Sequence, residues 1–209
     1  MLALLSQGGA FMLPLLLGSA IALAIGFERT WFFARFPQSG KPFRTELDRL
    51  LEQEDLEGAQ KLAAGEGPAR GVARAGLRHW NSSPELFEAA LGAEAKEHDP
   101  VLHRFLGALE TIVTAAPLIG LLGTITGMMG VFRTVAGKLA NDPHANTTGI
   151  TAGIGEALVA TATGIFVAVL ALFIHNIFQS MAESRMIEAD QTAETLRLAH
   201  ARNREKKRG

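Results

Sequence analysis

The hydrophobic and polar positions of this chain fall into long, separate blocks. Three windows contain no Asp, Glu, Lys or Arg, and they lie at 7–27, 111–132 and 157–182. An α-helix needs roughly 20 apolar residues to cross the hydrocarbon core of a bilayer, and each window is about that long. The pattern therefore predicts an all-α membrane protein with three transmembrane helices.

The charged segments outside these windows also show helical periodicity. In 28–110, apolar residues recur at spacings near one helical turn, as at Leu47, Leu50 and Leu51, while Pro and Gly divide the segment into several short helices. From Pro84 an apolar stripe continues toward the second window. This stripe predicts one helix that leaves the bilayer and extends into the cytoplasm.

Beyond the third window, a seam of mostly small apolar residues alternates by four and three among charged residues. The seam consists of Ala182, Met186, Ala189, Ala193 and Leu196. Such a seam packs either against helices of the same chain or against a neighbouring subunit, and the sequence leaves both interpretations open.

Composition agrees with this division of the chain. Of the 209 residues, 48% are hydrophobic and 20% are charged, and the mean hydropathy is +0.18. Of the 41 Lys, Arg, Asp and Glu residues, 37 lie in 28–110 and 183–209. The absence of Cys excludes disulfides and thiolate metal sites, and the net charge of −1 argues against nucleic-acid binding. We expect no cofactor and no metal.

Lys and Arg residues set the predicted orientation. Segment 28–110 holds 11 of them, 183–209 holds seven and 133–156 holds two. Because Lys and Arg concentrate on the cytoplasmic side of a membrane, the two rich segments are predicted to be cytoplasmic. The predicted order is an outer N-terminus and first transmembrane helix at 1–27, a cytoplasmic helical segment at 28–110, a second transmembrane helix at 111–132, a short extracytoplasmic connection at 133–156, a third transmembrane helix at 157–182, and a cytoplasmic helical tail at 183–209.

A cleaved signal peptide is the alternative interpretation of the first window, because Ala20-Ile21-Ala22 resembles a cleavage site. No Lys or Arg precedes the window, however, and its apolar run is longer than the roughly 7–15 residues of a signal-peptide core. A retained transmembrane helix is therefore the preferred interpretation.

Small residues mark one face of each of the last two windows. Gly120, Gly123, Gly127 and Gly130 span an arc of roughly 80° at about 100° per residue, with Pro117 one turn earlier. Close packing explains such glycines, because small residues let membrane helices approach. The matching side of the third window, which can pack or line a narrow wet passage, carries Ala157, Ala160, Thr161, Gly164, Ala168, Ala171 and His175.

Polar groups near lipid are costly and are therefore candidates for function. Glu156 lies where the third window begins, and it fits both a functional carboxylate and a helix N-terminal charge favoured by the macrodipole. Thr124, Thr161 and Thr163 can each bond the carbonyl one turn back, so a lone membrane threonine is usually structural. His175 is expected to be neutral and bonded to a neighbouring carbonyl.

Motifs of known enzyme classes are missing from the sequence. The stretch that begins at Gly130 lacks the glycine spacing of a P-loop and has Leu139 where Ser or Thr is required. Neither G-x-S-x-G nor H-E-x-x-H occurs. We therefore expect no catalytic activity.

Two longer motifs carry a family resemblance. LGALETIVTAAPLIGLLGTITGMMGVF at 106–132 and GIGEALVATATG at 153–164 resemble the second and third spans of the MotA/TolQ/ExbB proton channel family. The order of one span, a large cytoplasmic segment and two spans resembles the ExbB and TolQ branch, ExbB in preference to TolQ. One departure is Ala168-Val169-Leu170, where family members often have Ala-Ile-Pro, so a kink expected there is in doubt.

The resemblance implies a homopentamer in the inner membrane, with the second and third spans lining a central pore. It also implies a single-span ExbD- or TolR-like partner, whose membrane aspartate carries the proton, and a TonB- or TolA-like protein to be energised. Thr124 and Thr161 match the pore-facing threonines of the family, and Glu156 matches an acid near the pore mouth. The implied function is a stator subunit that uses the proton motive force.

Two other functions stay open at this point. The chain is a structural scaffold if the partner's aspartate handles the proton alone, and the threonines would then tolerate apolar replacement. An independent ion channel would conduct without a partner, but no acid lies in the middle of any window. Membrane lipid is a further expected contact, because the basic run 202–208 fits both anionic head groups and a solvated tail.

Overall fold

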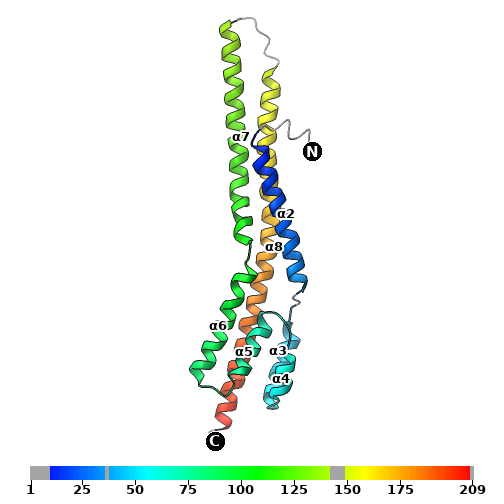
Figure 1. The fold of residues 1–209 in the computed structure, drawn as a ribbon, viewed down its shortest axis with the longest axis vertical. Coiled ribbons are helices and arrows are strands. Elements are labelled where there is room, and N and C mark those ends of the chain that lie inside the picture. Colours follow the sequence, from blue (N-terminus) through cyan, green and yellow to red (C-terminus); the bar gives the residue numbers. More distant parts are fainter. Residues whose placement is uncertain (1–9, 36–37, 142–148, 208–209) are drawn as a thin grey trace. The chain divides into compact units, whose positions relative to one another are not determined.

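The protein is described by a computed structural model that covers residues 10–35, 38–141 and 149–207 (Figure 1). All regular elements in these residues are helices, which confirms the predicted all-helical class. Three of them, α2, α7 and α8, are long and apolar enough to cross a membrane. The helices are α2 (Met12–Arg35), α3 (Gly40–Glu52), α4 (Leu56–Leu62), α5 (Pro68–Arg78), α6 (Pro84–Leu102), α7 (Leu106–Asn141) and α8 (Gly149–Lys206).

The chain divides into two compact units, each made of two stretches. We call the first the apolar unit, which comprises the described residues of Met1–Glu28 and Phe105–Ile177. The second, the charged unit, comprises the described residues of Arg29–Arg104 and Phe178–Gly209. The apolar unit therefore combines the first part of α2, α7 and the first part of α8. The charged unit combines the end of α2, helices α3 to α6 and the rest of α8.

In the apolar unit, the small-residue side of the third window faces inward. Ala160 and Ala171 are fully buried, whereas Leu158 and Ile165 on the opposite side are more than half exposed. Leu15, Ala116, Val167 and Ala168 form the local core. Helix α8 continues through 168–170 without interruption. The exposed apolar side is the surface expected to meet lipid or another subunit.

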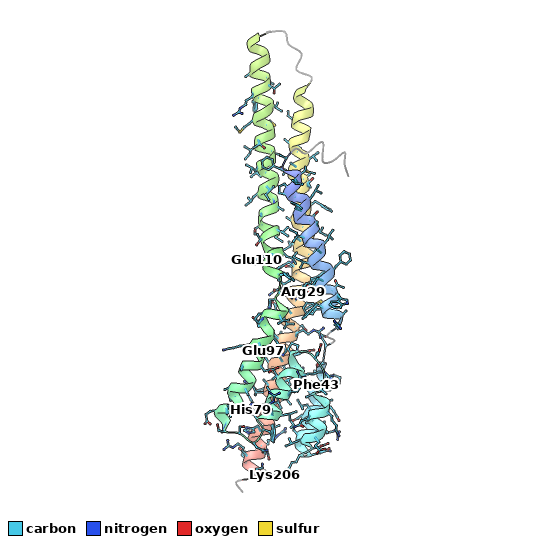
Figure 2. All side chains as sticks on the ribbon, in the orientation of Figure 1. Arg29, Phe43, His79, Glu97, Glu110 and Lys206 are labelled. Carbon is cyan, nitrogen blue, oxygen red and sulfur yellow. The ribbon has the colours of Figure 1, made fainter. Side chains whose placement is uncertain are left out.

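In the charged unit, the core is built on the periodic apolar positions that the sequence predicts. Leu47, Leu50 and Leu51 of α3 are buried together with Phe43 (Figure 2). Three residues of the C-terminal seam join the same core, and they are Ala189, Ala193 and Leu196. The seam therefore packs against its own chain, which decides between the two interpretations left open by the sequence.

Ion pairs hold the end of α8 against the acidic residues of this unit. Arg202 bonds the carboxylates of Asp48 and Glu52, the latter at 2.9 Å, and Lys206 bonds Glu54 at 2.6 Å. Exposed pairs of this kind stabilise a fold only weakly, because solvent screens them. Two cations of the basic run at the end of the chain, Arg202 and Lys206, are therefore engaged within the protein.

Helix starts in this unit combine local and distant caps. Asp55 Oδ1 accepts a hydrogen bond from the Gly58 amide at 2.8 Å, as expected of an N-cap residue. Helix α3 is capped differently, because the Glu188 carboxylate of α8 accepts from the amides of Ser39 and Gly40, both at 3.2 Å. A carboxylate at this position also complements the helix dipole.

The prediction of one continuous helix from Pro84 into the second window is wrong. Helix α6 ends at Leu102 and α7 begins at Leu106, with Phe105 in the left-handed region at φ +66°. Arg29, which is 1% exposed, donates from Nη1 to the carbonyls of Val101 and Leu102 at 3.1 and 3.4 Å (Figure 2). In a continuous helix these two carbonyls would accept hydrogen bonds from backbone N–H groups of the next turn. Because the helix ends here, the Arg29 guanidinium satisfies them instead.

Candidate site at the close approach of helices α7 and α8

Helices α7 and α8 come into backbone contact where two glycines face each other. A Cβ built on Gly164 would lie 2.5 Å from the Ala116 carbonyl oxygen and 3.1 Å from the Gly120 Cα. A Cβ built on Gly120 would lie 2.9 Å from the Ala160 carbonyl oxygen and 3.0 Å from the Thr161 Cα. Since these neighbours are backbone atoms, a side chain at either glycine would force the helices apart.

Two further glycines of α7 continue this seam, and one does not. Cβ atoms on Gly123 and Gly127 would lie 2.8 and 2.9 Å from the Cβ atoms of Ala160 and Ala157. Among the residues that the structure describes, no atom outside its own helix lies within 4 Å of the position that a Cβ would take on Gly130. The glycine face of α7 thus meets the small-residue side of α8 over its first three glycines.

Two threonines meet at the level of this contact. The Thr161 hydroxyl on α8 donates to the Gly120 carbonyl on α7 at 2.9 Å, and its oxygen lies 3.3 Å from Thr124 Oγ1. Thr124 in turn lies 2.7 Å from the Leu121 carbonyl, to which its hydroxyl donates. Both threonines are half-buried.

Thr161 differs from the other threonines described in this unit. Six of them donate to a carbonyl of their own helix, one turn back, and these are Thr111, Thr114, Thr124, Thr126, Thr134 and Thr163. Thr161 instead reaches across to α7. The ordinary structural role of a membrane threonine therefore describes the six but leaves Thr161 with an interhelical role.

The threonine pair has more acceptors than protons. Two hydroxyl protons are shared among the carbonyls of Gly120 and Leu121 and the two hydroxyl oxygens. A hydroxyl rotates about its C–O bond and both donates and accepts, so the protons can redistribute among these acceptors. The surroundings are apolar, since the charge-free window of α7 includes the exposed Leu121 and Ile125. In such surroundings hydrogen bonds to the pair are strengthened.

The remaining predicted residues lie along the same helices. Pro117 is within α7, one turn before Gly120, and is half-buried. Glu156 belongs to α8, but its side chain lies outside the described part of the structure. His175 is half-buried on α8, and its Nδ1 lies 3.3 Å from the side-chain oxygen of Asn176. Its partner is thus the side-chain carbonyl oxygen of the neighbouring residue.

The contact between the threonines and the role of the Gly120 carbonyl were not predicted from the residues themselves. The helical wheel places Thr124 at the margin of the glycine face and Thr161 within the small-residue side of α8. Packing the glycine face of α7 against the small-residue side of α8 places the two threonines near each other. This packing is the sequence signal from which their contact could have been predicted. In the described residues, no group of three or more His, Asp or Glu is placed to hold a metal ion.

The sequence of α7 and of part of α8 matches known proteins. The model of the MotA/TolQ/ExbB proton channel family matches residues 64–191, which include both α7 and the first part of α8. A protein of Synechocystis sp. named ExbB-like 1 is 38% identical over 86% of this chain and 71% of its own. The biopolymer transport protein ExbB of Pseudomonas putida is 28% identical over 88% of this chain and 58% of its own.

A third relative is the Tol-Pal system protein TolQ of Pseudomonas aeruginosa. It is 34% identical over 45% of this chain and 39% of its own. The family match, the ExbB-like relatives and the two sequence motifs on α7 and α8 agree, and the chain belongs to the MotA/TolQ/ExbB proton channel family.

Proposed function

We propose that this chain is the proton-channel and stator subunit of an inner-membrane motor. The motor would use the proton motive force to energise a TonB- or TolA-like protein that spans the envelope. The observation that carries the proposal is the interhelical Thr161 hydroxyl, which bonds the Gly120 carbonyl beside Thr124. Relatives named for biopolymer transport and for the Tol-Pal system support it.

The proposed assembly is a homopentamer with α7 and α8 around a central pore that holds an ExbD- or TolR-like helix. Large apolar residues on α7 and α8 are exposed in the single chain, as at Leu118, Phe132, Phe166 and Phe173, and so are available to lipid, a partner helix or another subunit. The proposed orientation places 28–110 and 183–209 in the cytoplasm. This orientation is supported by the Lys and Arg residues, 18 of 20 of which lie in these two segments.

In the proposed mechanism, the proton passes between the partner's membrane carboxyl group and the threonine pair. Thr161 and Thr124 would accept a hydrogen bond from the protonated acid or donate one to the carboxylate, because a hydroxyl does both. Glu156 would attract the proton near the pore mouth. Each charge that crosses 100 mV releases about 2.3 kcal/mol, so several transfers supply the energy for a stepwise movement of the partner.

Replacement of Thr161 tests this function. Thr161→Val keeps the shape and removes the hydroxyl, and Thr161→Ser keeps the hydroxyl. We expect Thr161→Val to abolish uptake that depends on the proton motive force, and Thr161→Ser to retain it. Oligomer size and co-purification of the single-span partner should be unchanged in both variants, which separates proton handling from assembly. Normal uptake with Thr161→Val would overturn the role of the hydroxyl.

A structural scaffold is the second candidate, and one observation favours it. The Thr161 hydroxyl donates to a backbone carbonyl of a helix that it packs against, which is also how a polar residue stabilises two membrane helices. On this hypothesis the partner's aspartate carries the proton alone. Thr161→Val would then lower the stability of the packing between α7 and α8 within the chain, while leaving the uptake per assembled complex unchanged.

A further inference from the structure

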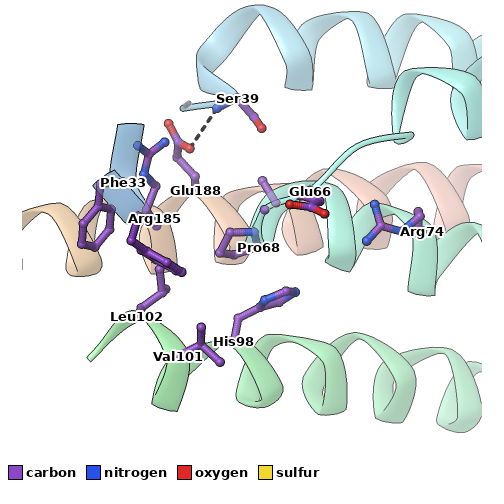
Figure 3. A pocket seen from close by; sticks show the side chains of 13 residues that line it. Phe33, Ser39, Glu66, Pro68, Arg74, His98, Val101, Leu102, Arg185 and Glu188 are labelled. Atoms are coloured by element: carbon purple, nitrogen blue, oxygen red, sulfur yellow. Dashed lines mark hydrogen bonds between the residues drawn. The ribbon is translucent and has the colours of Figure 1, made fainter. Parts of the chain in front are cut away.

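The charged unit contains a cavity of about 350 Å³ that the proposed proton path does not use (Figure 3). Its volume lies within the roughly 300–1,000 Å³ typical of small-molecule sites. Apolar walls come from three separate helices, with Phe33 on α2, Pro68 on α5, and Val101 and Leu102 on α6. The cavity therefore lies where the helices of this unit converge.

One cation in the wall of this cavity lacks a partner. Arg185 of α8 is 7% exposed, and its Nε and Nη1 atoms are buried without a hydrogen-bond acceptor among the residues that the structure describes. Burial lowers the pKa of the Arg185 guanidinium, and the charge of nearby Glu188 acts in the opposite direction. Arginine stays protonated under such conditions, so a charged group with unused donors faces the cavity.

Two of the other charged groups of the wall, Glu188 and Arg74, are engaged elsewhere. Glu188 accepts hydrogen bonds from the amides of Ser39 and Gly40 at the start of α3. Arg74 donates to the carbonyls of Ala63 and Gly65. His98 Nε2 in the same wall also lacks a hydrogen bond, but it lies 3.3 Å from Glu94 Oε1. Because the Arg185 guanidinium is positively charged and has unused donors, its missing partner is an acceptor that carries negative charge.

We propose that this cavity binds a monoanionic amphiphile, with a carboxylate or phosphodiester head on Arg185 and an apolar body against Phe33, Val101 and Leu102. The planar guanidinium offers two parallel donors that match such a head group. The apolar walls gain from covering a hydrocarbon body. Glu66 and Glu188 in the same wall disfavour a second negative charge on the ligand.

The occupant would connect three helices of the unit at once. It would touch α2 through Phe33, α6 through Val101 and α8 through Arg185. Because the ligand binds the folded unit, it should raise the free energy of unfolding of the charged unit. At ligand concentrations above the dissociation constant, this increase should grow with the logarithm of the ligand concentration. The proposal does not depend on proton transport.

The test uses the full chain in discs of neutral phosphatidylcholine, titrated with dodecanoate, with empty discs to subtract partition into lipid. Dodecanol supplies the same body without the charge. We expect Arg185→Met to weaken dodecanoate binding by about tenfold or more, because a charge-assisted hydrogen bond is lost. Arg49→Met is the matched control, since Arg49 is exposed and pairs with Glu46, and it should leave binding unchanged.

Folding is monitored separately by thermal unfolding without ligand. Removal of an unpaired buried charge should leave the stability of Arg185→Met equal to or above that of the unchanged protein. Adding phosphatidylglycerol to the discs identifies the source of the head group: competition with dodecanoate indicates a membrane lipid, and its absence indicates a soluble amphiphile. Equal binding of dodecanoate to the unchanged protein and to Arg185→Met, or equal binding of dodecanoate and dodecanol, would overturn the proposal.

Discussion

Gly164→Ala tests the close approach of α7 and α8 most directly. The added Cβ would lie 2.5 Å from the Ala116 carbonyl oxygen, and contacts shorter than 3.4 Å are tighter than nine in ten real Cβ contacts. Moving from 2.5 to 3.4 Å requires the helices to separate by 0.9 Å. The same movement would stretch the 2.9 Å bond from Thr161 to Gly120 to 3.8 Å, beyond hydrogen-bonding distance.

The expected cost follows from these distances. Overpacking of this kind costs about 1–3 kcal/mol, and the lost hydrogen bond adds about 0.5–1.5 kcal/mol. The better helix propensity of Ala returns about 1 kcal/mol. We therefore expect Gly164→Ala to destabilise the apolar unit by about 0.5–3.5 kcal/mol.

Unfolding of the purified protein in mixed micelles, followed by circular dichroism, measures this loss. The matched control is Gly130→Ala, because no described atom outside its own helix lies within 4 Å of that added Cβ. The control should be neutral or more stable by up to about 1 kcal/mol. Equal stability of the two variants would refute the inferred backbone contact between α7 and α8.

Two further predictions concern the charged unit. Arg29→Met should destabilise the unit by about 1–3 kcal/mol, since the carbonyls of Val101 and Leu102 lose a buried donor. Faster hydrogen exchange in the last turn of α6 would reveal this loss, whereas unchanged exchange would contradict the capping role. His200 is 6% exposed and stacks on Phe87 with centroids 4.2 Å apart, and burial together with the charge of Arg204 lowers its pKa below the ordinary 6.5. The unfolded chain therefore binds a proton on His200 more readily than the folded chain does. The contribution of neutral His200 to the free energy of unfolding is complete above pH 6.5 and is lost as the pH falls toward the lowered pKa, with a slope of up to about 1.4 kcal/mol per pH unit. Urea unfolding between pH 7.5 and 5.5 should show this slope and its disappearance in His200→Phe, and an equal slope in both proteins would contradict it.

The sequence predicted the local elements well and the junctions poorly. The buried positions of α3 and the inward side of α8 follow from helical periodicity, which depends on residues three and four apart. The break between α6 and α7 was missed, because Phe105 is not a residue type that signals positive φ. The Arg29 cap that accompanies the break joins residues 72 positions apart.

Several features were therefore decided by the sequence itself and others by tertiary packing. The charge-free windows, the uneven distribution of Lys and Arg and the glycine face of α7 are local patterns, and they determined the all-helical class and the candidate spans. The partner of each polar group was decided only when helices packed. Thr161 finds its acceptor 41 residues away, Glu188 caps a helix 148 residues earlier in the chain, and Arg185 is left without an acceptor among the described residues. Periodicity determines which face of a helix is buried, but hydrogen bonding depends on distances between atoms of different helices, and only the folded chain sets those distances.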